Sequence, residues 1–182
     1  MKRIFVVLFV LISSQAFSQS FENLTVGKPA IDFKIETIQG NEVQLSEINK
    51  NHPVVLVVLR GWPGYQCPIC SRQVGGLVAD ADNFAQLGAA VLMVYPGPSE
   101  QMQEHAKEFA EDFDFPENFY FTLDPDYMMI NKYGLRWDET KETAYPSTFV
   151  FSKKGEIVFS KISKKHGGRA DNKDIIEALN KL

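Results

Sequence analysis

The sequence predicts an α/β domain with a central mixed sheet flanked by helices, and two apolar runs carry this prediction. Residues 54–59 and 89–94 are continuous apolar runs, as is typical of strands buried on both faces in parallel sheets. Between them, from Cys70 to Ala85, apolar residues recur at helical spacing. The 182 residues, 45% of them hydrophobic, suit one domain with a sizeable core.

The first residues have the pattern of a secretory signal peptide over 1–18. Two basic residues follow Met1, residues 4–12 are an unbroken apolar run, and Ala16-Phe17-Ser18 fits the small-x-small cleavage rule. The apolar run is too short to cross a bilayer, which needs about 20 residues. We therefore expect an exported protein, periplasmic or extracellular, with a mature domain over 19–182 and no stable membrane anchor.

The middle of the chain predicts two helices around a short strand. Ser99 is expected to cap the first helix. Residues 119–123 predict the strand, and Asp124-Pro125 predicts an N-cap followed by a proline in the first turn of the second helix. Gly134 is the expected end of that helix, because glycine commonly follows the last helical residue.

Two β-hairpins frame this central part. Residues 31–38 and 42–45 flank a Gln-Gly-Asn turn, and residues 147–151 and 156–162 flank a Lys-Lys-Gly turn. Asp171 is expected to cap a final helix. A strand-helix-strand unit followed by a hairpin and a helix is the thioredoxin arrangement. The expected fold is therefore thioredoxin-like, with an N-terminal β-hairpin extension.

Both cysteines of the chain lie in one stretch, Cys67-Pro68-Ile69-Cys70, where a strand and a loop lead into a helix. Backbone N–H groups at a helix start favour an anion, so Cys67 is expected to be a thiolate at neutral pH. Side chains three residues apart on a helix are neighbours, so Cys67 and Cys70 can form a disulfide. Redox catalysis requires the two sulfurs to lie close together and not to be sealed inside the core.

Other uses of two cysteines fit the sequence less well. A structural disulfide stabilises mainly by closing a long loop, and this loop is very short. A zinc site normally takes four ligands, but His52, His105 and His166 are scattered along the chain. We expect no cofactor and no metal. The net charge of −4, without a basic stretch, argues against a nucleic-acid partner.

The stretch RGWPGYQCPICSRQ, residues 60–73, resembles the active site of the peroxiredoxin-like redoxins. These belong to the alkyl hydroperoxide reductase/thiol-specific antioxidant group (AhpC/TSA), here in its Cys-Pro-x-Cys branch. Further similar segments are LDPD at 123–126, KYG at 132–134, YPSTFV at 145–150 and HGGR at 166–169. The resemblance extends over about residues 26–181.

The resemblance implies a role for each cysteine. Cys67 would take oxygen from a hydroperoxide and become a sulfenic acid, and Cys70 would condense with it to a disulfide. A thiol electron-donor protein would reopen that disulfide by exchange. Arg60 is expected either to stabilise the Cys67 thiolate or orient the oxidant, or simply to end a buried strand. His166 and Arg169 lie in a loop that either reaches the site or is solvated.

Two departures from the family pattern keep other functions open. Gly64 stands where the family typically has Thr or Ser, and Pro146 stands where it has Arg. Pro146 is instead similar to the cis-proline of thioredoxin-like disulfide reductases, which implies a cis bond before it and a substrate strand held by the Tyr145 backbone. Trp62 is either a wall of the substrate pocket or an ordinary packing residue.

Three functions follow from these patterns. The first is a thiol-dependent peroxidase that cycles its two cysteines between dithiol and disulfide. The second is a thiol–disulfide oxidoreductase that acts on exported proteins. The third is a non-enzymatic carrier that holds a metal such as copper through two thiolates, although no Met-rich or His-rich segment lies near the cysteines.

Overall fold

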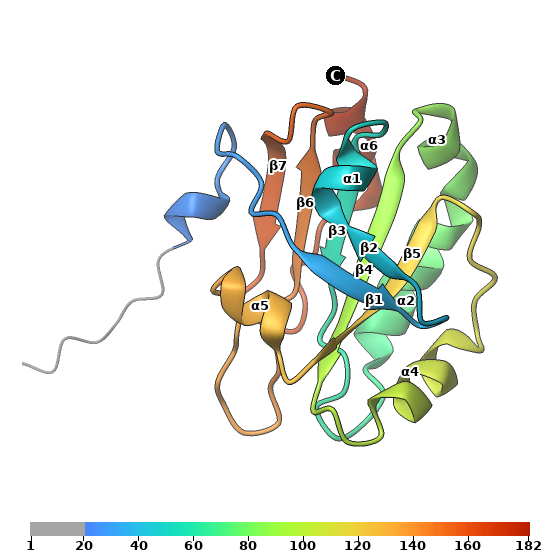
Figure 1. Ribbon diagram of the computed structural model, residues 1–182, viewed down its shortest axis with the longest axis vertical. Coiled ribbons are helices and arrows are strands. Elements are labelled where there is room, and N and C mark those ends of the chain that lie inside the picture. The colour runs from blue at the N-terminus through green and yellow to red at the C-terminus, as the bar shows by residue number, and fades with distance from the viewer. Residues whose placement is uncertain (1–20) are drawn as a thin grey trace, which may run out of the picture.

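The computed structural model describes residues 21–182, in which a seven-stranded mixed sheet carries helices on both faces (Figure 1). The strand order is β2-β1-β5-β4-β3-β6-β7. The strands are β1 (Lys34–Thr37), β2 (Glu42–Gln44), β3 (Val54–Val58), β4 (Ala90–Gly97), β5 (Phe119–Pro125), β6 (Ser147–Phe151) and β7 (Ile157–Ile162). This architecture confirms the predicted fold class. The predicted signal peptide, 1–18, lies outside the described residues.

The three central strands β3, β4 and β5 are parallel, and every other pairing in the sheet is antiparallel. The hairpin of β1 and β2 extends the sheet beyond β5, as the N-terminal extension was expected to do. The helices are α1 (Leu45–Asn49), α2 (Pro68–Ala79), α3 (Ala81–Gln86), α4 (Met102–Ala110), α5 (Met128–Lys132) and α6 (Asn172–Leu179), after a 3-10 turn, Glu22–Leu24. Within residues 21–182, no helix is both long and apolar enough to cross a membrane.

Strand β3 divides the core into two layers, because alternate side chains of a strand point to opposite faces. Val55 and Val57 pack with the buried residues of α2, α3, α4 and α6. Val54, Leu56 and Val58 pack on the other side with those of α1 and α5. All five side chains are fully buried. Burial on both faces explains why this strand is a continuous apolar run rather than an alternating one.

Two expectations about helix starts are wrong. The helix expected to be capped by Ser99 begins at Met102, after Gln101, which has a positive φ of 57°. Asp124 and Pro125 do not begin a helix, because the pairing of β5 with β4 continues to Pro125 opposite Gly97. That longer pairing holds these residues in extended backbone.

Asp124 nevertheless caps α5 from the end of the strand. Its buried carboxylate accepts hydrogen bonds from the backbone N–H groups of Met129, at 2.7 Å, and Ile130, at 3.0 Å. The sequence predicts that Asp124 stands directly before the helix. In the structure it lies near the end of β5 and contacts α5 across the residues that separate the two elements. Asp171 occupies the position before α6 at which it was expected, but its side chain makes no capping hydrogen bond. Helix α2 begins at Pro68, directly after Cys67, where a helix start was expected.

Candidate active site

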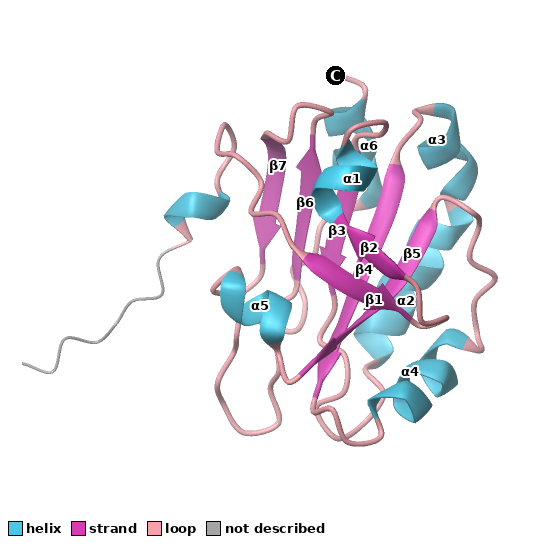
Figure 2. Cartoon of the chain, in the orientation of Figure 1, coloured by secondary structure: helices cyan, strands magenta, loops and turns pink. Residues whose placement is uncertain are grey.

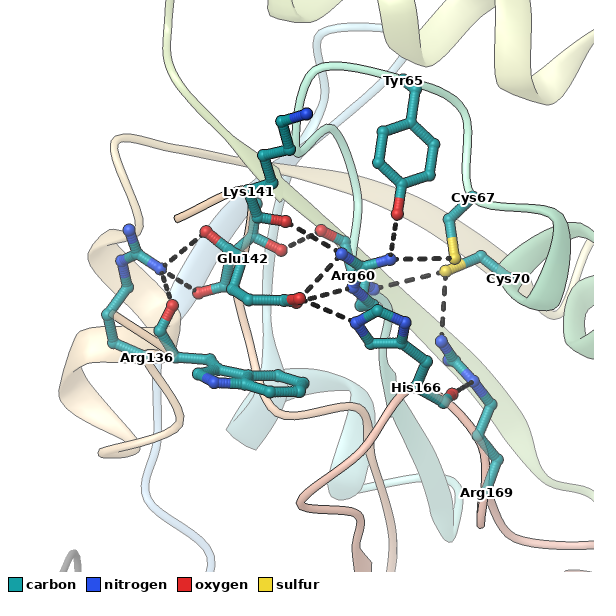
Figure 3. A network of polar contacts seen from close by, with 11 residues as sticks. Arg60, Tyr65, Cys67, Cys70, Arg136, Lys141, Glu142, His166 and Arg169 are labelled. Atoms are coloured by element: carbon teal, nitrogen blue, oxygen red, sulfur yellow. Dashed lines mark hydrogen bonds and ion pairs between the residues drawn. The ribbon is translucent and has the colours of Figure 1, made fainter. Parts of the chain in front are cut away.

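Cys67 is the residue immediately before α2, and Pro68 occupies the first helical position. The carbonyl of Cys67 accepts the N–H of Ser71, so the chain enters the helix at this cysteine. Cys70 lies in the first turn, and both cysteines are free thiols. The expected placement of the pair at a helix start is therefore confirmed. Figure 3 shows the two sulfurs next to each other.

The cysteines are close but well covered. Cys67 is 2% exposed and Cys70 is fully buried. The expectation that the sulfurs lie close together is confirmed, whereas the expectation that they are not sealed inside the core is wrong, because both are buried among core residues. Any reagent must therefore be small or must displace part of the cover before it reaches Cys67.

Arg60 approaches both sulfurs from the end of β3. Its backbone N–H donates to Cys70 Sγ at 3.4 Å, and its guanidinium Nη1 lies 3.8 Å from Cys67 Sγ. The side chain is 1% exposed. A guanidinium remains charged in a buried site, so Arg60 places a permanent positive charge beside Cys67.

A cage of acceptors holds this buried guanidinium. Arg60 Nε and Nη2 lie 3.0 Å and 2.9 Å from Glu142 Oε2. Nη2 also donates to the carbonyl of Lys141 at 2.9 Å, and Nη1 donates to the hydroxyl of Tyr65 at 2.9 Å. The carbonyl of Arg60 accepts the Thr143 hydroxyl. These contacts compensate the cost of burying a charge and fix the direction of the guanidinium.

Glu142 was not identified from the sequence. It lies in the long loop between α5 and β6, which descends below α5 in Figure 2, and Arg136 holds this loop by donating to the carbonyls of Glu142 and Thr143. The second oxygen of Glu142 lies 2.7 Å from Nε2 of His166. A buried arginine requires an anionic partner, but nothing in the sequence indicates which of 23 acidic residues provides it.

Arg169 reaches the site from the loop before α6. Its Nη2 lies 3.3 Å from Cys70 Sγ, its Nη1 donates to Gln73 Oε1, and its Nε donates to the carbonyl of His166 at 3.2 Å. Of the two sequence-based alternatives for this loop, the structure supports the one in which it reaches the cysteines.

The surroundings shift the two cysteine pKa values in opposite directions. The hydrogen bond from the Cys70 thiol, then the Cys70 backbone N–H, the charge of Arg169 and the hydrogen bond from Arg60, outweigh burial and lower the pKa of Cys67 to about 5. Burial, together with the neighbouring Cys67, raises the pKa of Cys70 well above its ordinary value. At neutral pH the pair therefore holds one thiolate, on Cys67, and one thiol, on Cys70.

The predicted substrate-binding residues lie in other contacts. The Trp62 ring stacks on His105 at 3.5 Å, and the Tyr145 ring stacks on Trp137 at 5.0 Å. Within residues 21–182, no hydrogen bond or ring contact joins Trp62, Tyr145 or Pro146 to a sulfur. Their role in substrate binding stays a prediction.

The cis bond expected before Pro146 is wrong, because the described residues contain no cis peptide bond. The trans form is the intrinsically favoured isomer, and the backbone around it is already paired. The Tyr145 N–H donates to the carbonyl of Leu135, the Tyr145 carbonyl accepts the Ser147 hydroxyl, and the Pro146 carbonyl accepts the Ser163 N–H.

Among the described residues, no group of three or more His, Cys, Asp or Glu is placed to hold a metal ion.

Comparison with known proteins decides the family. A sequence model of the AhpC/TSA family matches residues 26–160. The chain belongs to the AhpC/TSA family. No curated protein matches it in sequence.

Solved structures of several thiol-redox proteins share the fold of this chain. Peroxidoxin BcpB from Mycobacterium tuberculosis is 18% identical, with a TM-score of 0.66 over 87% of this chain and 98% of its own. The reduced 2-Cys peroxiredoxin of Plasmodium vivax is 18% identical, with a TM-score of 0.65 over 85% and 80%. A putative thiol:disulfide interchange protein DsbE from Chlorobium tepidum is 20% identical, with a TM-score of 0.63 over 86% and 99%. At these identities the similarity establishes the fold, and the family establishes thiol-based redox chemistry in general.

Proposed function

We propose that this AhpC/TSA protein is a thiol-dependent peroxidase in which Cys67 attacks the hydroperoxide. The Cys67 thiolate attacks one peroxide oxygen, the O–O bond breaks, and the other oxygen leaves as an alkoxide or hydroxide that takes up a proton. The product is a sulfenic acid on Cys67. Cys70 then displaces its hydroxyl group as water and forms the disulfide. A thiol donor protein, which must displace part of the cover over Cys67 to reach the disulfide, then restores both thiols and becomes oxidised itself.

The observation that carries this proposal is the position of the Arg60 guanidinium, 3.8 Å from Cys67 Sγ. The family resemblance implies an arginine at the position of Pro146. Here Arg60 brings a guanidinium to the sulfur from β3 instead. Its charge favours the thiolate and stabilises the negative oxygen that leaves as the O–O bond breaks. The departure at Pro146 therefore does not deprive the site of a guanidinium.

Burial of Cys67 favours a small oxidant over a protein disulfide. Attack on a disulfide requires its sulfur to come into contact with the attacking thiolate, and Cys67 is 2% exposed. Hydrogen peroxide needs much less room. A thiol–disulfide reductase would also need free backbone groups to hold a substrate strand, and the N–H and carbonyl of Tyr145 are already hydrogen-bonded.

Export after cleavage behind Ser18 is part of the same proposal. Outside the cytoplasm a disulfide between Cys67 and Cys70 would persist, so a dedicated thiol donor in that compartment would be needed for turnover. N-terminal sequencing of the protein recovered from the periplasm or the medium tests this part. A start at Gln19 is the expected result, and an uncleaved chain in the cytoplasm would overturn it.

The experiment for the catalytic proposal compares reduced wild type, Cys67→Ser and Cys70→Ser with hydrogen peroxide and with a mixed-disulfide peptide at neutral pH. We expect wild type to lose thiols to peroxide more than about tenfold faster than free cysteine does, because its attacking thiol is already ionised. Cys67→Ser should not react, and Cys70→Ser should stop at the sulfenic acid. Faster reaction with the mixed disulfide than with peroxide would favour the oxidoreductase. Tight binding of copper without turnover of either substrate would favour the metal carrier.

A further inference from the structure

Each sulfur of the pair is in direct contact with a different guanidinium. Arg60 Nη1 lies 3.8 Å from Cys67 Sγ, and Arg169 Nη2 lies 3.3 Å from Cys70 Sγ. Figure 3 shows the two arginines approaching from different sides, Arg60 from β3 and Arg169 from the loop before α6. In the proposed reaction, the cation at Cys67 acts in the first step, the attack on the peroxide. It leaves open what the cation at Cys70 does.

Arg169 is held in place rather than extended into solvent. Its Nη1 donates to Gln73 Oε1 and its Nε donates to the carbonyl of His166. Gln73 lies on α2, one turn beyond Cys70. The contact with Gln73 therefore ties Arg169 to the same helix that carries the sulfur it faces, and the remaining nitrogen is left for Cys70.

Cys70 has a chemical need for such a partner. Only a thiolate attacks sulfur efficiently, and burial raises the pKa of the Cys70 thiol well above its ordinary value. Among the groups around Cys70, Cys67 opposes its ionisation, whereas the charge of Arg169 and the backbone N–H of Arg60 favour it. Arg169 is the side-chain cation in direct contact with this sulfur.

We propose that Arg169 is a catalytic residue for the second half of the cycle, in which it stabilises Cys70 as a thiolate. When the Cys70 sulfur attacks the sulfenic acid of Cys67, the S–O bond breaks, and the departing hydroxide takes the Cys70 proton and leaves as water. When the thiol donor later attacks Cys67 of the disulfide, the S–S bond breaks and Cys70 leaves as a thiolate beside Arg169. This inference rests on the proposed order of the two cysteines.

On this proposal the two arginines act mainly in different steps: Arg60 in the reaction with peroxide, and Arg169 in the reactions of Cys70. Cys67 has a pKa of about 5, so at pH 7.5 it stays almost fully ionised even if the loss of Arg169 raises that pKa by about one unit. Changing Arg169 should therefore leave the reaction with peroxide almost unchanged and slow only the steps that involve Cys70.

The test compares wild type, Arg169→Gln, Arg169→Lys and Arg72→Gln at pH 7.5. Arg72 is a matched control, because it lines the same groove as Arg169 and its side chain makes no hydrogen bond or ion pair within residues 21–182. Each reduced protein is mixed with one equivalent of hydrogen peroxide. Stopped flow follows oxidation of Cys67, and mass spectrometry after quenching follows the disulfide and the dimedone adduct of Cys67 sulfenic acid.

We expect Arg169→Gln to oxidise at the wild-type rate, to form the disulfide about tenfold more slowly or worse, and to accumulate the dimedone adduct. Arg169→Lys, which keeps the charge but cannot hold both Gln73 and Cys70, should be intermediate, and Arg72→Gln should match wild type. Disulfide formation at the wild-type rate in both Arg169 variants would overturn the inference. If thermal unfolding shows that Arg169→Gln does not fold, Arg169→Lys decides by the same criterion.

Measuring the reductive half of the cycle distinguishes failure of this inference from failure of the proposed function. Each protein is oxidised to the disulfide with diamide, and its opening by dithiothreitol is followed. Arg169→Gln should again be about tenfold slower than Arg72→Gln. If wild type does not react with peroxide, the proposed function fails, and this second measurement still tests Arg169. Equal opening rates would contradict its role at Cys70.

Discussion

The carboxylate of Glu142 lies 2.9 Å from the guanidinium of Arg60, and the two side chains are 11% and 1% exposed. The pair joins the end of β3 to the loop that precedes β6. It thereby fixes the arginine that lies beside Cys67.

Replacing Glu142 by Gln should destabilise the protein strongly. Removing one partner leaves the charge of Arg60 buried without compensation, which typically costs about 3–5 kcal/mol. Urea unfolding of the reduced protein measures the effect. The control is Glu177→Gln, which removes a pair with Lys181 whose two side chains are 60% and 71% exposed and should change stability little. Similar losses of unfolding free energy in both variants would contradict the claim that Glu142 compensates the buried charge of Arg60.

Replacing Arg60 by Lys should affect catalysis in two ways that pH separates. Losing the Arg60 contact raises the pKa of Cys67 from about 5, and a rise of about one unit lowers the thiolate fraction severalfold near pH 5 but hardly at pH 7.5. A slower reaction with peroxide at pH 7.5 therefore reports lost stabilisation of the departing oxygen, and the additional loss near pH 5 reports lost ionisation. Arg72→Lys is the matched control. A pH profile unchanged by Arg60→Lys would show that Arg60 does not act on Cys67.

The thiolate of Cys67 should make the reduced protein more stable as pH rises. Its pKa is lowered from an ordinary 9.0 to about 5 in the fold. Between these values the unfolded chain holds the proton and the folded protein does not, so stability rises with pH, by at most about 1.4 kcal/mol per unit. The contribution is complete above the unfolded pKa and is lost as pH falls through the folded one.

Urea unfolding of reduced wild type and Cys67→Ser between about pH 5 and pH 8 measures this contribution as the difference between the two proteins. Keeping below about pH 8 excludes Cys70, whose raised pKa acts in the opposite direction only at higher pH. A difference that stays constant over this range would mean that Cys67 is a protonated thiol in the folded protein.

Gly61 fixes the path of the chain between β3 and the cysteines. Its φ is +60°, and a Cβ built there would lie 1.9 Å from the backbone oxygen of Pro96. Gly61→Ala should therefore destabilise by about 3 kcal/mol or more. Gly64 also has a positive φ, +102°, but a Cβ there would have nothing within 4 Å. Gly64→Ala should lower the free energy of unfolding only by the backbone strain, about 1–2 kcal/mol. Urea unfolding measures both variants, and equal losses would contradict the close approach of Gly61 to Pro96 on β4.

The sequence predicted those parts of the fold whose cause is local. The run at 54–59 is apolar throughout because both faces of β3 are covered. Cys67 lies at a helix start because Pro68 suits the first turn. The start of α5 was mispredicted because Asp124 caps that helix from β5, through a contact that depends on how far β5 pairs with β4.

The site could be predicted only in part, because its polar partners come from distant loops. Arg60 and the cysteines lie within one short stretch, whereas Glu142 lies 82 positions after Arg60 and Arg169 lies 99 positions after Cys70. No periodicity or local motif links such positions. The low exposure of Cys67 was likewise not foreseen.

The most direct test of the central claim is a pH titration of the reduced protein by thiolate absorbance near 240 nm, with Cys67→Ser subtracted. The position of Cys67 before α2, its hydrogen bond from Cys70 and its two neighbouring arginines predict a midpoint at about pH 5. Cys70 should contribute no thiolate below about pH 9. A midpoint for Cys67 near that of free cysteine, about 8.5, or ionisation of Cys70 before Cys67, would contradict the claim that Cys67 is the attacking thiolate.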